Sequence, residues 1–352
     1  MGSSKHEVSE TENGLPVRKP GKMAKMKQHF IKFWWLHLII FVLLTLTLLL
    51  LCFYVIVPVI AQDKINKAKL EIQGVAVENP EPDWYLMSIN STIRTDGQVK
   101  ATIDPFIGDM YLEELGPEHT FAKIRFPQTN ANKFQMVNIS KQYIEINNRE
   151  AFTTFNEWFT NNETLKVTIK GKPSVTPRGL AKSYSVDFKK TLELKGLNKL
   201  EGIKVNNATV EFATNKQNST DFRNFWATTE IPNPSHFTLQ IGNAVFNNYA
   251  AGQNFGKLYV NNFVLRPGMN EVKASGNIDQ AKILEVGSQR PYCESGVIDF
   301  TLIGTNVTNL DGHFLSYYTT ALANTNTTVG INVTETLYNS NVPASIGCSS
   351  EE

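Results

Sequence analysis

The sequence has few of the residues and motifs that catalysis or metal binding requires. Its 352 residues include three cysteines and six histidines. It contains no Gly-x-Ser-x-Gly, His-Glu-x-x-His, Walker or dinucleotide-binding motif, and the spacing of His119, His236 and His313 matches no familiar metal site. These absences predict a protein that is not an enzyme and that uses no cofactor or metal.

Residues 33–60 contain no charged side chain. A transmembrane helix needs about 20 apolar residues to cross ~30 Å of hydrocarbon, so this segment predicts a single transmembrane helix. A cleaved signal peptide is the alternative, but its apolar region is usually about half as long as this one. The sequence therefore favours a permanent membrane anchor.

The residues before this span are polar and basic. Residues 1–32 carry seven lysines and arginines against three acidic residues, and they lack apolar periodicity, which predicts a disordered tail. The positive-inside rule places such a tail in the cytosol. We therefore expect a cytosolic N-terminus, with everything after residue 60 in a lumen.

The region beyond the tail has no excess of positive charge. The net charge of the chain is +1, and outside residues 1–32 there are 27 basic and 30 acidic residues. Proteins that bind nucleic acid present a strongly basic surface, so nucleic acid is not an expected partner of the lumenal part.

Asn-x-Ser/Thr sequons occur only after the predicted span, which supports the same orientation because such sites are glycosylated on lumenal or secreted segments. The candidate glycosylation sites are Asn90, Asn138, Asn162, Asn207, Asn218, Asn306, Asn326 and Asn332.

The cysteines predict one covalent link. Cys52 lies inside the predicted span, whereas Cys293 and Cys348 lie in the lumenal part, where an oxidising environment favours disulfides. The simplest interpretation pairs Cys293 with Cys348 and thereby fixes the C-terminal tail to the body. Two separate thiols are the alternative, because sequence alone does not show that the two Cα atoms come within ~7 Å.

The lumenal region is predicted to be mainly β. Segments rich in β-branched and aromatic residues alternate in polarity and end at Gly or Asn, as in 69–77, 164–171, 185–194, 256–265, 270–278 and 297–304. Two short helices interrupt them. One is indicated by apolar residues at helical spacing over 151–159, and the other begins at Asp279.

The two halves of the lumenal region repeat one pattern. Residues 77–89, which contain Asn79-Pro80, align with residues 231–241, which contain Asn233-Pro234, and in each half a strand, a helix and a strand follow. Proline cannot donate to a strand ladder, so each Asn-Pro pair should mark a strand end. The repeat predicts one domain over 66–197 and a second over 198–348.

The pattern IPNPSHFTLQIGNAVF…GQNFGKLYVNNFVLRPGMNEVKASGNI (231–278) resembles the fungal family DUF3712 and, more distantly, the LEA-2 (late embryogenesis abundant, type 2) domain. The resemblance covers the lumenal region and is clearest over 200–320. It implies two tandem immunoglobulin- or fibronectin-like β-sandwiches, each with a short helix, in single-pass proteins of the fungal vacuolar membrane, some of which handle lipids. It implies no catalytic residues.

Aromatic residues are dense around the first predicted helix, at Phe152, Phe155, Trp158 and Phe159. They indicate either a large core or an apolar cleft, and a cleft would make these four residues lipid contacts. The sequence thus favours a non-enzymatic membrane glycoprotein whose sandwiches act as a binding or scaffolding module, with membrane lipids and an unidentified protein as partners. The resemblance implies the vacuolar membrane, and the plasma membrane and the endoplasmic reticulum are the alternatives. The alternative is a lipid-binding or lipid-transfer protein with a LEA-2-type groove.

The orientation can be tested directly. Because every sequon follows the anchor, endoglycosidase should increase the gel mobility of the full chain made in fungal cells, and residues 61–352 should resist protease in sealed vesicles. A chain that shows no mobility shift and loses residues 61–352 to external protease would have the opposite orientation.

Overall fold

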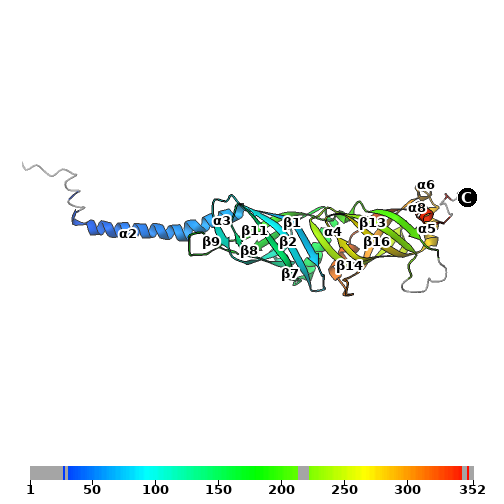
Figure 1. Cartoon of the computed structure of the whole chain (residues 1–352), viewed down its shortest axis with the longest axis horizontal. Coiled ribbons are helices and arrows are strands. Elements are labelled where there is room, and N and C mark those ends of the chain that lie inside the picture. The colour runs from blue at the N-terminus through cyan, green and yellow to red at the C-terminus, as the bar shows by residue number, and fades with distance from the viewer. Residues whose placement is uncertain (1–26, 28–30, 213–221, 343–346, 349–352) are drawn as a thin grey trace, which may run out of the picture. The chain divides into compact units, whose positions relative to one another are not determined.

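The computed structural model describes residue 27 and residues 31–212, 222–342 and 347–348. Two compact units divide it, Met1–Val59 and Ile60–Glu352. The first contains the apolar helix, formed by α2 (Trp34–Leu51), a π-helical stretch (Cys52–Ile56) and the start of α3 (Val57–Lys67) (Figure 1). Together these elements make a helix from Trp34 to Lys67 that is long and apolar enough to cross a membrane, so the predicted apolar helix is present.

The described part of the second unit is mainly β, as predicted, and its sheets form sandwich-like layers. Its largest sheet has ten strands, of which eight run in the order β12-β13-β16-β15-β14-β1-β2-β7, while β17 pairs with β14 and β18. Their bounds are β1 (Lys69–Glu78), β2 (Trp84–Arg94), β7 (Phe134–Glu145), β12 (Lys204–Val210), β13 (Phe225–Asn233), β14 (Phe237–Ala250), β15 (Gln253–Leu265), β16 (Gly268–Ile278), β17 (Val297–Thr308) and β18 (Thr327–Asn332).

Two smaller sheets come from the first half of the chain. One has the order β11-β8-β4-β5 and the other β10-β9-β3-β6. Their strands are β3 (Ala101–Ile103), β4 (Phe106–Leu112), β5 (Ala122–Phe126), β6 (Thr129–Asn130), β8 (Thr164–Gly171), β9 (Ser174–Pro177), β10 (Tyr184–Ser185) and β11 (Phe188–Lys195). The β11-β8-β4-β5 sheet supplies buried side chains to the same core as β1 and β2, so it forms the second layer of the first half.

Both predicted short helices are present. The first is α4 (Arg149–Asn161), which begins where the Asn148 side chain accepts a hydrogen bond from the Ala151 amide, an N-cap arrangement. The second is α5 (Gln280–Gly287), capped in the same way by Asp279. The other short helices are two 3₁₀ turns (Pro117–His119 and Asn198–Leu200), α6 (Tyr292–Ser295), α7 (Ser316–Ala323) and α8 (Val333–Asn339).

The Asn-Pro pairs end strands as predicted. β1 ends at Glu78, directly before Asn79, and β13 ends at Asn233. In the second pair the Asn233 side chain shapes the turn: its Nδ2 donates to the Phe237 carbonyl at 2.8 Å, and its Oδ1 accepts from the Ser235 amide at 3.0 Å. The residues that the repeat aligns across the halves are all buried: Tyr85, Met87, Ile89, Phe237, Leu239 and Ile241.

The structure differs from the prediction of two self-contained sandwiches. β1, from the first half, pairs in parallel with β14, from the second, with Val75 opposite Phe237 and Val77 opposite Leu239. The predicted boundary falls at the 3₁₀ turn Asn198–Leu200, yet one sheet crosses it. An unpaired strand edge exposes backbone hydrogen-bond donors and acceptors. At Phe237–Leu239 of β14, β1 pairs with this edge. Sequence periodicity does not reveal which strand is the neighbour.

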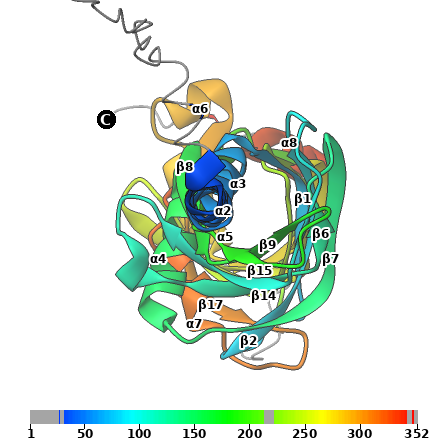
Figure 2. The same ribbon diagram turned by 90° about the vertical axis from the view of Figure 1, so that its left-hand side faces the viewer.

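Helices and turns join the halves as well. α4 packs on α7 of the second half (Figure 2), with the rings of Phe152 and Tyr317 edge to face at 4.8 Å. Beside them the Tyr317 hydroxyl donates to the Glu81 carbonyl at 3.0 Å, and Asn309 Nδ2 donates to the Pro80 carbonyl at 3.1 Å. The turn after β1 is therefore held by the second half.

The predicted disulfide is confirmed: Cys293 and Cys348 are bonded, with their Cα atoms 5.0 Å apart. The bridge joins α6 to residue 348, beyond α8. It therefore fixes the C-terminal tail to the body, as expected.

The shared sheet makes a prediction about fragments. Residues 198–348 expressed alone should unfold without a cooperative transition, or with a much lower Tm than residues 61–352, because β14 loses β1 and α7 loses α4. Circular dichroism melts of the two fragments would show this. Equal, cooperative transitions would mean that the second half is self-contained after all.

Candidate functional site

Helix α4 places three aromatic rings between the layers of the first half. Its buried face consists of Ala151, Phe152, Phe155, Asn156, Phe159 and Thr160. Phe155 stacks on Phe121 with ring centroids 4.3 Å apart, and Phe152 stacks on Tyr85 at 5.1 Å. Among the four predicted lipid contacts, Phe152, Phe155 and Phe159 line a cavity, whereas Trp158 is not among its lining residues and packs, partly buried, against the core.

The opposite wall of this cavity is built by β1 and β2. Four residues of β1 line it: Leu70, Ile72, Val75 and Val77. The register with β2 shifts between Ile72 and Gly74. Because of this shift, the odd-numbered residues after it face the same side of the sheet as the even-numbered residues before it. From Leu70 to Val77 the strand covers about 20 Å at ~3.3 Å per residue. The cavity thus follows most of the length of β1.

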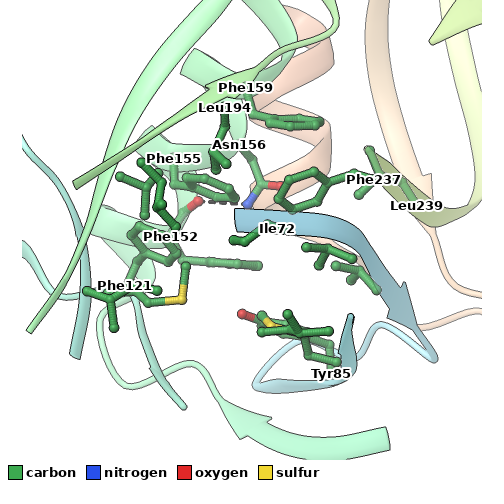
Figure 3. Close-up of a pocket in the computed structure, with 18 of the residues that line it drawn as sticks. Ile72, Tyr85, Phe121, Phe152, Phe155, Asn156, Phe159, Leu194, Phe237 and Leu239 are labelled. Carbon is green, nitrogen blue, oxygen red and sulfur yellow. Dashed lines mark hydrogen bonds between the residues drawn. The ribbon is translucent and has the colours of Figure 1, made fainter. Parts of the chain in front are cut away.

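We call this cavity the first slot (Figure 3). Twenty-two of the described residues line a space of only about 40 Å³, so the space is small for the extent of its walls. The lining residues are Leu70, Ile72, Val75, Val77, Tyr85, Met87, Ile89, Ser91, Met110, Phe121, Phe126, Phe152, Phe155, Asn156, Phe159, Val167, Ile169, Leu192, Leu194, Phe237, Leu239 and Tyr318.

Among the residues that the structure describes, no charged side chain lines the first slot. Two of its polar groups are already hydrogen-bonded: the Ser91 hydroxyl donates to the Val137 carbonyl at 2.8 Å, and Asn156 Nδ2 donates to the Phe152 carbonyl of its own helix at 2.7 Å. Burial raises the pKa of the Tyr85 and Tyr318 phenols, so both hydroxyls stay neutral at any physiological pH. The slot can therefore hold an apolar group and offers nothing to pair with a charge.

A second slot of about 60 Å³ lies in the other half. Phe225, Ala227, Thr229 and Ile231 of β13 face it in alternation, again over about 20 Å of strand. The other lining residues are Leu200, Ile203, Val205, Phe246, Leu258, Val260, Phe263, Val272, Ala274, Phe300, Leu302, Thr327, Val329 and Ile331. β14 serves both slots, since Phe237 and Leu239 line the first and Phe246 lines the second.

The structure places the predicted glycosylation sites on the surface wherever it describes them. The exposed asparagines are Asn90, Asn138, Asn162, Asn207, Asn306, Asn326 and Asn332, and Asn218 lies outside the described residues. Asn90 and Asn138 are direct partners across β2 and β7. Surface exposure is compatible with glycan attachment at each described site.

Sequence reasoning missed the strand walls and the buried asparagine of the first slot. β1 was expected only as a strand over 69–77, and β2 only as part of the repeat at 77–89, because the sequence does not show which layer faces them. Asn156 had a visible signal: it occupies a buried position on the apolar face of α4, where asparagine is unfavourable in a helix interior.

The family model described as "Protein of unknown function (DUF3712)" matches residues 119–248. This match supports the DUF3712 family for that segment. The DUF3712 match runs from the 3₁₀ turn at Pro117–His119 into β14, so it includes α4 and crosses the predicted boundary at 197/198. It overlaps only the start of the 231–278 pattern that resembles this family.

Other comparisons add little. No curated protein matches the chain. The Salmonella enterica SafA pilin in complex with the SafB chaperone is 10% identical, with 70% of this chain and 92% of that chain covered and a TM-score of 0.17. A Mobiluncus mulieris adhesin, in two crystal forms, is 10% and 11% identical, with 68% of this chain and 80% of that chain covered and TM-scores of 0.19. Such scores support no conclusion about this protein.

The first slot predicts unequal effects of two neighbouring substitutions. Phe155→Ala should lower the free energy of unfolding by roughly 3–5 kcal/mol because it enlarges the cavity. Asn156→Leu should change it by less than about 1 kcal/mol, because it removes a buried amide without removing volume. Denaturant unfolding of both variants would test this. A large loss in Asn156→Leu would show that the hydrogen bond from its amide to the Phe152 carbonyl is needed for folding.

Proposed function

We propose that this protein is a membrane-anchored, non-enzymatic binding module whose slots hold the hydrocarbon part of a lipid. The observation that carries the proposal is the lining of the first slot: its residues are spread over about 20 Å of strand wall, and none of those that the structure describes there is charged. One leaflet of a bilayer has a hydrocarbon depth of about 15 Å, half of ~30 Å. A single lipid chain therefore matches the slot in length and polarity.

The slot must widen to admit such a chain. At about 40 Å³ it has room for only a few small groups. Met87 and Met110 line it, and methionine adapts to different packing arrangements more easily than branched residues do. Exchange of these side chains between rotamers is the movement that the proposal requires.

The rest of the chain fits this role. An apolar helix near the N-terminus would keep the module beside a bilayer, which supplies lipid. The resemblance to DUF3712 and LEA-2 proteins supports a vacuolar membrane with the slots on the lumenal side, and the exposed sequon asparagines support glycosylation there. The same module would hold lipid for transfer or for presentation to a partner protein.

Scaffolding is the second candidate, and one observation favours it. Phe134, Met136 and Tyr143 of β7 are between 52% and 59% exposed, and exposed apolar patches often bind proteins. The sequon residues Asn90 and Asn138 sit on the exposed side of the same strand pair. Glycans there would cover part of this face, which makes it less suited than the slots to be the main binding site.

Photolabelling can test the proposal. The full chain in nanodiscs of phosphatidylcholine with a diazirine on one acyl chain should crosslink in residues 34–60 and also in β1, β2 and α4. Met87→Trp should reduce the crosslinks around the first slot by about tenfold because it fills the space, at a stability cost of roughly 1–3 kcal/mol.

The matched control is Met136→Trp, on the exposed side of β7, which should leave slot labelling unchanged. Crosslinks confined to residues 34–60 in the unmodified chain would contradict lipid binding by the slots, because the anchor would then be the only part in contact with lipid.

A further inference from the structure

Asn248 is a fully buried amide without a partner. It lies on β14 opposite Leu302 of β17, and it is 0% exposed. Within the part of the chain that the structure describes, neither its Oδ1 nor its Nδ2 has a hydrogen-bond partner. A buried polar group left unpaired is destabilising, so a residue of this kind calls for an explanation.

The amide lines a small cavity that we call the end pocket. Its volume is about 30 Å³, and its walls come from α5, α8 and the ends of several strands. The lining residues are Val210, Phe212, Phe225, Asn248, Gln280, Ile278, Ile283, Leu284, Phe300, Ile331, Val333, Thr336 and Leu337. None of them is charged.

The end pocket adjoins the second slot. Phe225, Phe300 and Ile331 line both spaces, so only the thickness of these side chains separates them. At its other side Phe212 and Leu284 line the pocket and are 47% and 38% exposed. The pocket therefore lies between the second slot and the protein surface, with one polar side chain unsatisfied inside it.

A trapped water explains the amide less well than a ligand does. A buried water usually makes about three hydrogen bonds. The other polar side chains of the pocket already have partners: Gln280 Nε2 donates to the Glu211 carbonyl at 3.1 Å, and the Thr336 hydroxyl donates to the Asn332 carbonyl at 2.8 Å. Asn248 alone offers both a free donor and a free acceptor.

We propose that the end pocket and the second slot together bind a lipid alcohol, with its hydrocarbon chain in the slot and its hydroxyl on Asn248. This inference rests on the proposed function and names its ligand class. A hydroxyl can donate to Oδ1 and accept from Nδ2, which satisfies both atoms of the amide. A phosphate or ionised carboxylate cannot donate, and neither lining offers it a cation.

The test uses the full chain in nanodiscs of unlabelled phosphatidylcholine with three photoactivatable probes: a 16-carbon diazirine alcohol, its methyl ether, and a phosphatidylcholine that carries the same chain. The alcohol should label peptides around Phe225, Phe300 and Ile331 roughly tenfold more than the ether does, because the ether accepts a hydrogen bond but cannot donate one. Asn248→Leu should abolish this preference while leaving labelling of the first slot unchanged.

Each outcome decides a separate question. Equal labelling by alcohol and ether in the unmodified chain, or an alcohol preference that persists in Asn248→Leu, would overturn the role of Asn248 and leave an amide that binds water only. Labelling of the first slot would in that case still support lipid binding. If no probe labels either slot, the proposed function fails as well. Because the first comparison needs no variant, a folding defect in Asn248→Leu would not obscure the result.

Discussion

The parallel pairing of β1 with β14 is the interaction on which the rest of this structure depends. This pairing sets Val75 opposite Phe237 and Val77 opposite Leu239. It places one strand from each repeated half side by side, so the two halves share one sheet. Parallel neighbours need long connections, here more than 150 residues, so the pairing forms only once both halves are present. That requirement explains why a duplicated sequence need not give two independent domains.

The same pairing positions both slots. β14 gives Phe237 and Leu239 to the first slot and Phe246 to the second, so one continuous strand supports both sites. Aromatic rings of α4 and buried residues of both halves belong to one hydrophobic core, and the two slots lie within it, each lined by residues of β14.

Much of the local structure could be predicted from the sequence, because it depends on near neighbours. The helix at 151–159 extends to Arg149–Asn161, the Asn-Pro pairs end their strands, and Cys293 bonds Cys348. The partner of β1 could not be predicted, since alternation shows which side of a strand is buried but not what lies beside it. Asn248 was hidden as well, because a chain with many surface asparagines gives no sign of which one is buried in a strand, whereas Asn156 is marked by its place among the apolar residues of α4.

The energetic cost of the slots does not distinguish them from ordinary packing defects. At about 24 cal/mol per Å³, cavities of about 40 and 60 Å³ cost roughly 1 and 1.5 kcal/mol, an amount that many folds tolerate without any function. Volume alone therefore does not indicate a site. The Asn248 amide is the stronger indication, because both its Oδ1 and its Nδ2 are without a partner in the described structure and a leucine of similar size would remove this unpaired group at little cost. The Asn248 amide is stabilised only when a group that can both donate and accept a hydrogen bond occupies the space beside it.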